Sequence, residues 1–217
     1  MATHSLTTVA AFNDAKSTLA GNSGTDTLSF ASASSPIILT DSDFLGMDLV
    51  VDATTQIENL VLSSTAANTA TLGINAENIG IRTVFGGGAA DVIDVSNFTA
   101  SATVRGEAGD DRILGGAAAD SLLGGAGADS ILGGAGNDIV LGEAGADTIS
   151  GDAGDDSILG GDDSDSLVGG DGDNTLNGGN GNDTLSSSSS NDSLIGGDGS
   201  DYYLVSSTSG ANLYEIA

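Results

Sequence analysis

The chain of 217 residues carries 31 Asp and Glu against 4 Lys and Arg, a net charge of −27, with 34 glycines and no cysteine. So acidic a surface repels nucleic acid and anionic membranes and favours cations as partners. The lack of cysteine excludes disulfides and thiolate metal sites, and no apolar run approaches the ~18 residues of a membrane span.

The first half of the chain contains short apolar runs bounded by Ser, Thr, Asn, Ala or Gly. Their lengths suit β-strands, and they show little helical periodicity. We predict that residues 1–105 form an irregular β-solenoid that continues into the next segment rather than a separate globule. The runs are PIIL (36–39), MDLVV (47–51), IENLVL (57–62), ATLGI (70–74) and IGIRTV (79–84).

A strict repeat follows this half. From Gly106 to Leu204 the chain divides into eleven nonapeptides without an insertion. Ten of the eleven carry Asp at position six, and the eighth repeat carries Asn174 instead. Two weaker copies precede the block, GNSGTDTLS at 21–29 and GGGAADVID at 86–94. Position eight is always apolar: Ile113, Leu122, Ile131, Val140, Ile149, Ile158, Leu167, Leu176, Leu185, Leu194 and Tyr203.

Each nonapeptide combines a glycine-rich turn with a short strand. Glycine permits the positive φ angles of a tight turn, and the strand buries its middle residue while its neighbours point outward. Two units therefore form one coil of a flattened solenoid, whose strands stack into two parallel sheets. Position eight fills the thin interior, and position six places a row of carboxylates along each edge. Position nine faces outward, as we expect for Leu132.

The aspartate rows indicate a divalent cation. Carboxylates repel one another along each edge, and single apolar residues make too thin a core to offset the backbone entropy that folding removes. Calcium accepts about six to eight oxygen ligands, carbonyls included, and tolerates flexible loops. Zinc would require histidine or cysteine, and His4 is the only residue of either type. We therefore expect several Ca²⁺ ions as part of the fold.

The repeats resemble the GGxGxDxUx nonapeptide of the RTX (repeats-in-toxin) calcium-binding family, which suggests a surface-assembling, S-layer-like member. The resemblance implies an all-β fold, a parallel β-roll in which each ion lies between the turns of repeats n and n+2. Position-six carboxylates and turn carbonyls would hold the ions. It also implies export by a type I apparatus and folding outside the cell. The implied metal ligands are Asp111, Asp120, Asp129, Asp138, Asp147, Asp156, Asp165, Asp183, Asp192 and Asp201.

Some repeats depart from the pattern. Asn174 replaces the aspartate of the eighth repeat, and serines at 187–190 replace the glycine turn of the tenth. Both repeats are even-numbered and fall on the same edge, so we expect that edge to lose ions towards its C-terminal end. Tyr202 and Tyr203 widen the last coil. The predicted organisation is 1–105 as irregular solenoid, 106–204 as calcium-binding roll, and 205–217 as a C-terminal cap or truncated tail.

The even repeats also carry an outward aliphatic ridge. It consists of Leu123, Leu141 and Leu159 at position nine, widened by Ile139 at position seven. Contiguous apolar patches usually mark interfaces, so we predict self-association through this face. The alternative is a patch that the N-terminal part of the same chain covers.

Catalytic chemistry finds little support in the sequence. His4 alone cannot provide a Ser–His–Asp triad or an HExxH zinc site, so we predict no enzymatic activity. The preferred function is a secreted structural protein that folds on binding calcium and assembles into an S-layer-like array or sheath at the cell surface. The alternative is a calcium-dependent C-terminal module of a larger secreted enzyme, toxin or adhesin. Polysaccharide binding is weaker, because the surface is acidic and poor in aromatic residues.

Overall fold

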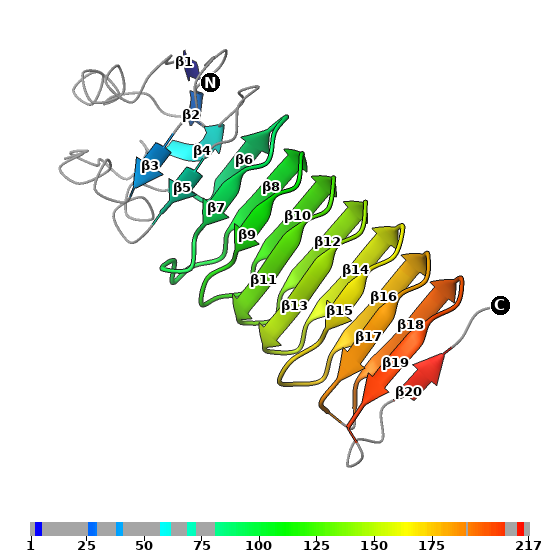
Figure 1. Cartoon of the computed structure of the whole chain (residues 1–217). Coiled ribbons are helices and arrows are strands. Elements are labelled where there is room, and N and C mark those ends of the chain that lie inside the picture. Colours follow the sequence, from blue (N-terminus) through cyan, green and yellow to red (C-terminus); the bar gives the residue numbers. More distant parts are fainter. Residues whose placement is uncertain are drawn as a thin grey trace.

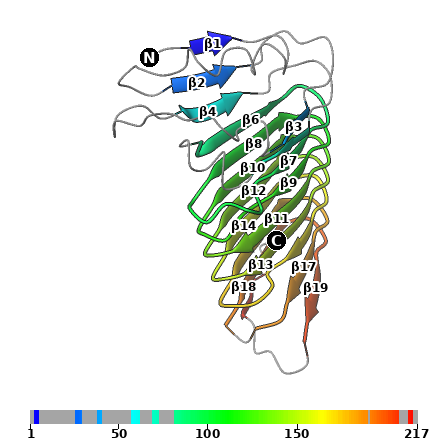
Figure 2. The same cartoon turned by 90° about the vertical axis from the view of Figure 1, so that its left-hand side faces the viewer.

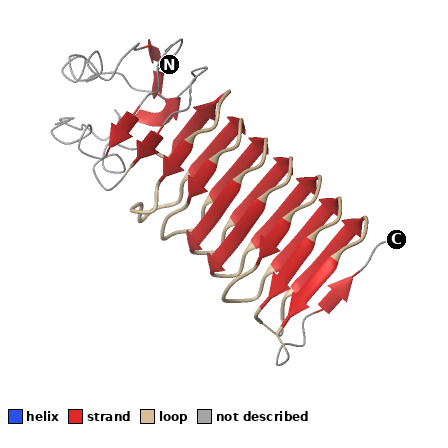
Figure 3. Cartoon of the chain, in the orientation of Figure 1, coloured by secondary structure: helices blue, strands red, loops and turns tan. Residues whose placement is uncertain are grey.

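The computed structural model describes residues 3–5, 26–29, 38–40, 57–61, 69–72, 81–189, 191–206 and 212–214. All regular elements of these residues are strands, arranged in two parallel sheets (Figures 1 and 3). The first sheet contains β1 (Thr3–Ser5), β2 (Asp26–Ser29), β4 (Ile57–Val61), β6 (Thr83–Gly87), β8 (Thr103–Ala108), β10 (Ser121–Ala126), β12 (Ile139–Ala144), β14 (Ser157–Asp162), β16 (Thr175–Asn180), β18 (Ser193–Asp198) and β20 (Asn212–Tyr214). The second contains β3 (Ile38–Thr40), β5 (Thr69–Thr71), β7 (Val92–Asp94), β9 (Arg112–Leu114), β11 (Ser130–Ala135), β13 (Thr148–Ala153), β15 (Ser166–Val168), β17 (Thr184–Ser187) and β19 (Tyr202–Val205).

From β2 onward the described strands alternate between the two sheets, so each of these coils gives one strand to each sheet. Within the repeat block, paired residues are 18 positions apart, as in Leu122 with Val140 and Ile131 with Ile149. The coils therefore stack along one direction, which Figure 2 shows from a second side. This parallel stacking of two nonapeptides per coil confirms the predicted β-roll.

Coils closer to the N-terminus are longer. In the first sheet, Leu28 pairs with Leu60 after 32 residues, Leu60 with Val84 after 24, and Val84 with Val104 after 20, before the spacing settles at 18. The described strands stay short, so the wider spacing means that more residues separate one described strand from the next. The described strands of this half thus join the same two sheets as the repeats, as a continuous solenoid requires.

Four of the five predicted apolar runs overlap strands β3 to β6. The fifth run, 47–51, lies outside the described residues. The weaker copy at 21–29 overlaps β2, and the copy at 86–94 overlaps β6 and β7. The strand prediction is therefore confirmed for these four runs, and the spacing between them follows no fixed period.

The core is a single file of side chains between the two sheets. Residues at position eight are buried throughout the block except Tyr203, which packs partly buried at the C-terminal end. Among the described residues, the largest fully buried side chain is Phe98, in the connection between β7 and β8. Leu132 is 37% exposed, which confirms that position nine points outward.

Candidate metal centre

Two rows of turns run along the edges of the roll. The turns of the odd-numbered repeats lead from the first sheet to the second, and we call this row the first edge. The turns of the even-numbered repeats lead back and form the second edge. The first edge carries the position-six residues Asp111, Asp129, Asp147, Asp165, Asp183 and Asp201, and the second edge carries Asp120, Asp138, Asp156, Asn174 and Asp192.

A regular turn needs positive φ angles at positions two and four. Gly125 and Gly127 of the third repeat have φ angles of 119° and 136°, which glycine adopts without a steric penalty. Asp163 holds position four of the seventh repeat at 75°, as the short polar side chain of aspartate tolerates. The sharp bend that follows from these angles directs the position-six carboxylate into the turn.

One carboxylate oxygen of each position-six aspartate is engaged with the preceding coil. The backbone N–H of Asp111 donates to Asp129 Oδ1 at 2.7 Å, and the N–H of Asp129 donates to Asp147 Oδ1 at 2.8 Å. The same bond recurs on the second edge between Asp120 and Asp138 (2.8 Å). Aspartates 18 residues apart are therefore neighbours on one edge, whereas those nine apart lie on opposite edges.

The second carboxylate oxygen is buried and receives no hydrogen bond in most of these turns. Leaving a buried acceptor unsatisfied costs about 1–3 kcal/mol, and more when it is charged. A cation would satisfy these atoms without any change in the fold. Such open Oδ2 atoms belong to Asp111, Asp129, Asp138, Asp147, Asp156, Asp165, Asp183 and Asp201.

Every open Oδ2 except that of Asp201 lies beside a backbone carbonyl of the next turn. A Cβ atom added to Gly106 would overlap Asp111 Oδ2 and lie 2.6 Å from the carbonyl oxygen of Gly124. A Cβ on Gly160 would likewise overlap Asp165 Oδ2 and lie 2.7 Å from the Gly178 oxygen. Two successive turns of one edge thus direct a carboxylate and a carbonyl oxygen towards the same glycine. An environment of oxygens alone, carbonyls included, suits a hard cation such as calcium.

Side chains do not complete a coordination shell by themselves. Within the part of the chain that the structure describes, no three His, Cys, Asp or Glu side chains converge on one point. The reason is that each turn contributes only one inward carboxylate. A cation bound here would therefore need further oxygens, and the nearby Gly124 carbonyl is a candidate.

Three consecutive stretches, 101–131, 132–167 and 168–203, match the family model of the RTX calcium-binding nonapeptide repeat (4 copies). Residues 101–203 are RTX repeats. RTX nonapeptide repeats bind calcium at multiple sites, so Ca²⁺ is the cation of this roll. No curated protein matches the chain.

Burial raises the pKa of several position-six aspartates above the ordinary value of 3.8. The pKa reaches about 7 for Asp111, Asp138 and Asp165 and about 6 for Asp129 and Asp147. The backbone N–H bonded to Oδ1 lowers each pKa, and neighbouring carboxylates on the edge raise it again. Without a cation, these carboxyls therefore take up protons at a higher pH in the folded roll than in the unfolded chain.

Two of the ten predicted ligands differ from the rest. Asp120 Oδ2 accepts the N–H of Gly116 at 2.7 Å. Asp192 Oδ2 accepts the hydroxyl of Ser187 at 2.6 Å and the N–H of Ser189 at 3.2 Å. Both carboxylates lie at position six as predicted, but protein donors already engage the oxygen that is open in the other RTX turns.

The N-terminal end of the first edge contains one residue that the sequence analysis did not select. Asp91 is buried, and its backbone N–H donates to Asp111 Oδ1 at 2.7 Å. It occupies position six of the weaker copy GGGAADVID, upstream of the 101–203 match. The aspartate at position six of that copy could have indicated this role. Its partner Asp111 is 20 residues away, however, and not the 18 that separate partners within the repeats.

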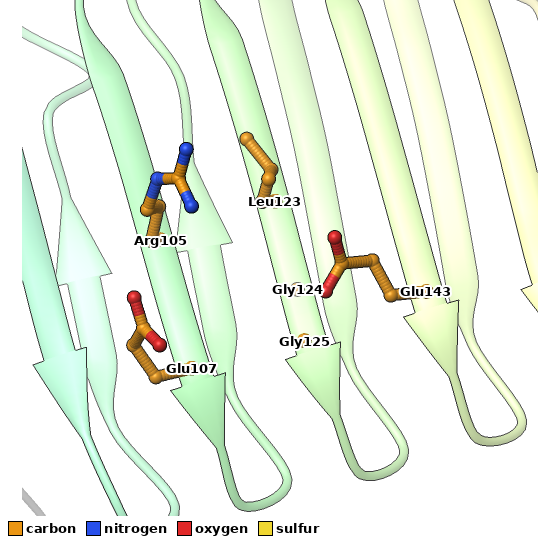
Figure 4. Close-up of a pocket in the computed structure, with 6 residues that line it drawn as sticks. All are labelled: Arg105, Glu107, Leu123, Gly124, Gly125 and Glu143. Atoms are coloured by element: carbon orange, nitrogen blue, oxygen red, sulfur yellow. The ribbon is translucent and has the colours of Figure 1, made fainter.

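A small hollow on the outer face of the first sheet is a separate feature. Arg105, Glu107 and Glu143 surround Gly125 there (Figure 4). Its volume of about 40 Å³ admits a few water molecules and no sugar ring. The turns, and not this hollow, are the candidate site.

Proposed function

We propose that the chain is a calcium-dependent structural module. Calcium ions along the turns neutralise the carboxylate rows and join successive coils, so that metal binding supplies folding free energy. The observation that carries this proposal is the recurrence of buried carboxylate oxygens without a protein donor. The proposed ligands are Asp111, Asp129, Asp138, Asp147, Asp156, Asp165, Asp183 and Asp201.

We further propose that the protein acts outside the cell. RTX repeat proteins are typically secreted, and extracellular calcium modules bind with dissociation constants of about 10⁻⁴–10⁻³ M. Cytosolic calcium lies below that range, so an acidic, glycine-rich chain would stay unfolded there. This behaviour suits passage through a type I export apparatus before folding. No helix among the described residues has the length and apolar character needed to cross a membrane.

The outer face of the first sheet supports self-association. Leu123 pairs in register with Leu141, and Leu141 with Leu159, so the ridge is continuous across β10, β12 and β14. Ile139 is 53% exposed and Leu159 38%. On the second sheet, Leu132 and Val168 are separated by Ser150. We propose that the continuous ridge contacts a second copy of the chain in a surface array, once calcium has reduced the negative charge.

A calcium titration tests the proposed function. We expect the metal-free chain at pH 7.5 to lack β-structure and to gain it cooperatively at about 0.1–1 mM calcium, as followed by far-ultraviolet circular dichroism. EDTA should reverse the change. A chain that keeps its full β-signal in EDTA would contradict the proposal. Light scattering of the calcium-loaded protein then separates an assembling structural protein from a monomeric module of a larger enzyme, toxin or adhesin.

Replacement of the ridge tests the interface. The triple change of Leu123, Leu141 and Leu159 to Ser should give a monomer in calcium while the circular dichroism stays that of the parent. The same change of Leu132, Val168 and Leu204, which are exposed aliphatic residues of the second sheet, is the control and should still assemble. Sedimentation velocity distinguishes the two. Assembly of the ridge variant at the parent level would place the interface elsewhere.

A further inference from the structure

We propose that the two edges of the roll differ in their need for calcium. The first edge binds ions along its whole length, whereas the second edge binds them only in its middle, around Asp138 and Asp156. At both ends of the second edge, protein groups take the place that an ion would otherwise fill. This inference rests on the proposed binding of calcium by carboxylates with an open Oδ2.

The first edge is uninterrupted. All six of its position-six residues in the repeats are aspartates, and each has a buried Oδ2 that no protein donor reaches. Asp91 continues the same register one turn further, through the bond from its N–H to Asp111 Oδ1. Every interval between successive coils on this edge therefore contains a carboxylate that needs a counter-charge.

At its N-terminal end, the second edge has a turn without a position-six aspartate. Phe98 is fully buried in the connection that precedes this edge, and Ala102 takes the position-six place by donating its N–H to Asp120 Oδ1 at 2.7 Å. The carbonyl of Phe98 accepts the N–H of Ala117 at 3.0 Å. An aromatic side chain and backbone bonds thus fill the first interval of this edge.

The next turn on this edge, in the second repeat, differs from the regular turns at position four. Ala118 stands where regular turns have glycine, and an alanine with positive φ costs about 1–2 kcal/mol. Neither Gly116 nor Ala118 adopts a positive φ. The turn instead directs the Gly116 N–H towards Asp120 Oδ2 at 2.7 Å. Both oxygens of Asp120 therefore have protein donors.

The C-terminal end of the second edge is closed by side chains. Asn174 is neutral and uses its Oδ1 to accept the N–H of Asp156 at 2.9 Å. Asp192 Oδ1 accepts the N–H of Asn174 at 2.8 Å, and its Oδ2 accepts the Ser187 hydroxyl at 2.6 Å. Beyond Asp156, the described position-six residues of this edge offer no buried carboxylate oxygen without a protein donor.

The consequence is an unequal distribution of ions. Six open carboxylates of the repeats lie on the first edge and two, Asp138 and Asp156, on the second. The turns of the second edge depend on metal at fewer positions than those of the first edge. Loss of calcium should therefore open the first edge before the second.

The test compares isosteric substitutions on the two edges. Asp129→Asn lies on the first edge and Asp192→Asn on the second, and both side chains are buried. The number of calcium ions per chain is counted by native mass spectrometry at saturating calcium, on protein whose circular dichroism shows it folded. We expect Asp129→Asn to lose at least one ion relative to the parent and Asp192→Asn to keep the parent count.

A gain of binding provides a second readout if Asp192→Asn does not fold. Asn174→Asp restores a carboxylate whose Oδ2 replaces a buried, unbonded Nδ2, so we expect it to add at least one ion. Equal losses from Asp129→Asn and Asp192→Asn, or an unchanged count in Asn174→Asp, would overturn the edge inference alone. A parent chain that binds no calcium would overturn the proposed function as well.

Discussion

In the absence of calcium, the chain should fold as the solution is acidified from about pH 8 to pH 5. The pKa of Asp111, Asp138 and Asp165 is about 7 in the fold, against 3.8 ordinarily, because the carboxyls are buried. The folded state therefore binds more protons than the unfolded chain between these values. The free energy of unfolding therefore increases as the pH falls. The contribution of these carboxyls is complete below the unfolded pKa of 3.8, and it is lost as the pH rises through about 7.

Circular dichroism in EDTA across this range measures the effect, at pH values above the isoelectric point of about 4.1. The control is the same series in saturating calcium. There the slope should reverse, since protons compete with calcium for the carboxylates. A metal-free chain that gains no β-structure on acidification would show that carboxylate repulsion and desolvation are not what keeps it unfolded.

Substitution of a position-one glycine should cost both stability and an ion. A Cβ on Gly142 would overlap Asp147 Oδ2 and lie 2.5 Å from the carbonyl oxygen of Gly160, so Gly142→Ala must displace both oxygens of the proposed site. Overpacking of this kind typically costs about 1–3 kcal/mol. We expect a lower midpoint of urea unfolding in calcium and at least one ion fewer per chain.

Gly88→Ala is the matched control for this change. Gly88 belongs to the weaker copy at 86–94, where an added Cβ meets no atom within 4 Å. Its stability and calcium count should equal those of the parent, within about 0.5 kcal/mol. If both alanine variants lost the same stability, crowding of the calcium turn would not be the cause of the loss.

Much of the fold could be predicted because the repeat is local. A period of nine with one apolar residue per unit fixes which residues enter the core, and Leu122 and Ile131 are buried as expected. Alternation of the units between two sheets places Asp129 and Asp138 on opposite edges. None of this depends on contacts between distant residues, which is why the register from 106 to 204 was readable.

The N-terminal half was less predictable for the same reason. Its coils shorten from 32 to 20 residues towards the repeats, so no period marks which residues become neighbours. Asp91 was missed because its partner Asp111 is 20 residues away, and the role of Phe98 is visible only through the turn that it contacts.

The sequence by itself therefore determined the parallel roll, its core positions, its two carboxylate rows and its calcium chemistry. Only the tertiary structure decided how each carboxylate divides its two oxygens. Asp129 Oδ1 is bound to the previous coil and its Oδ2 is open, whereas Asp192 is held on both sides by protein donors. The same residue type at the same repeat position thus has two environments. They differ because hydrogen-bond donors come from neighbouring turns, whose approach depends on backbone conformation that the repeat pattern does not specify.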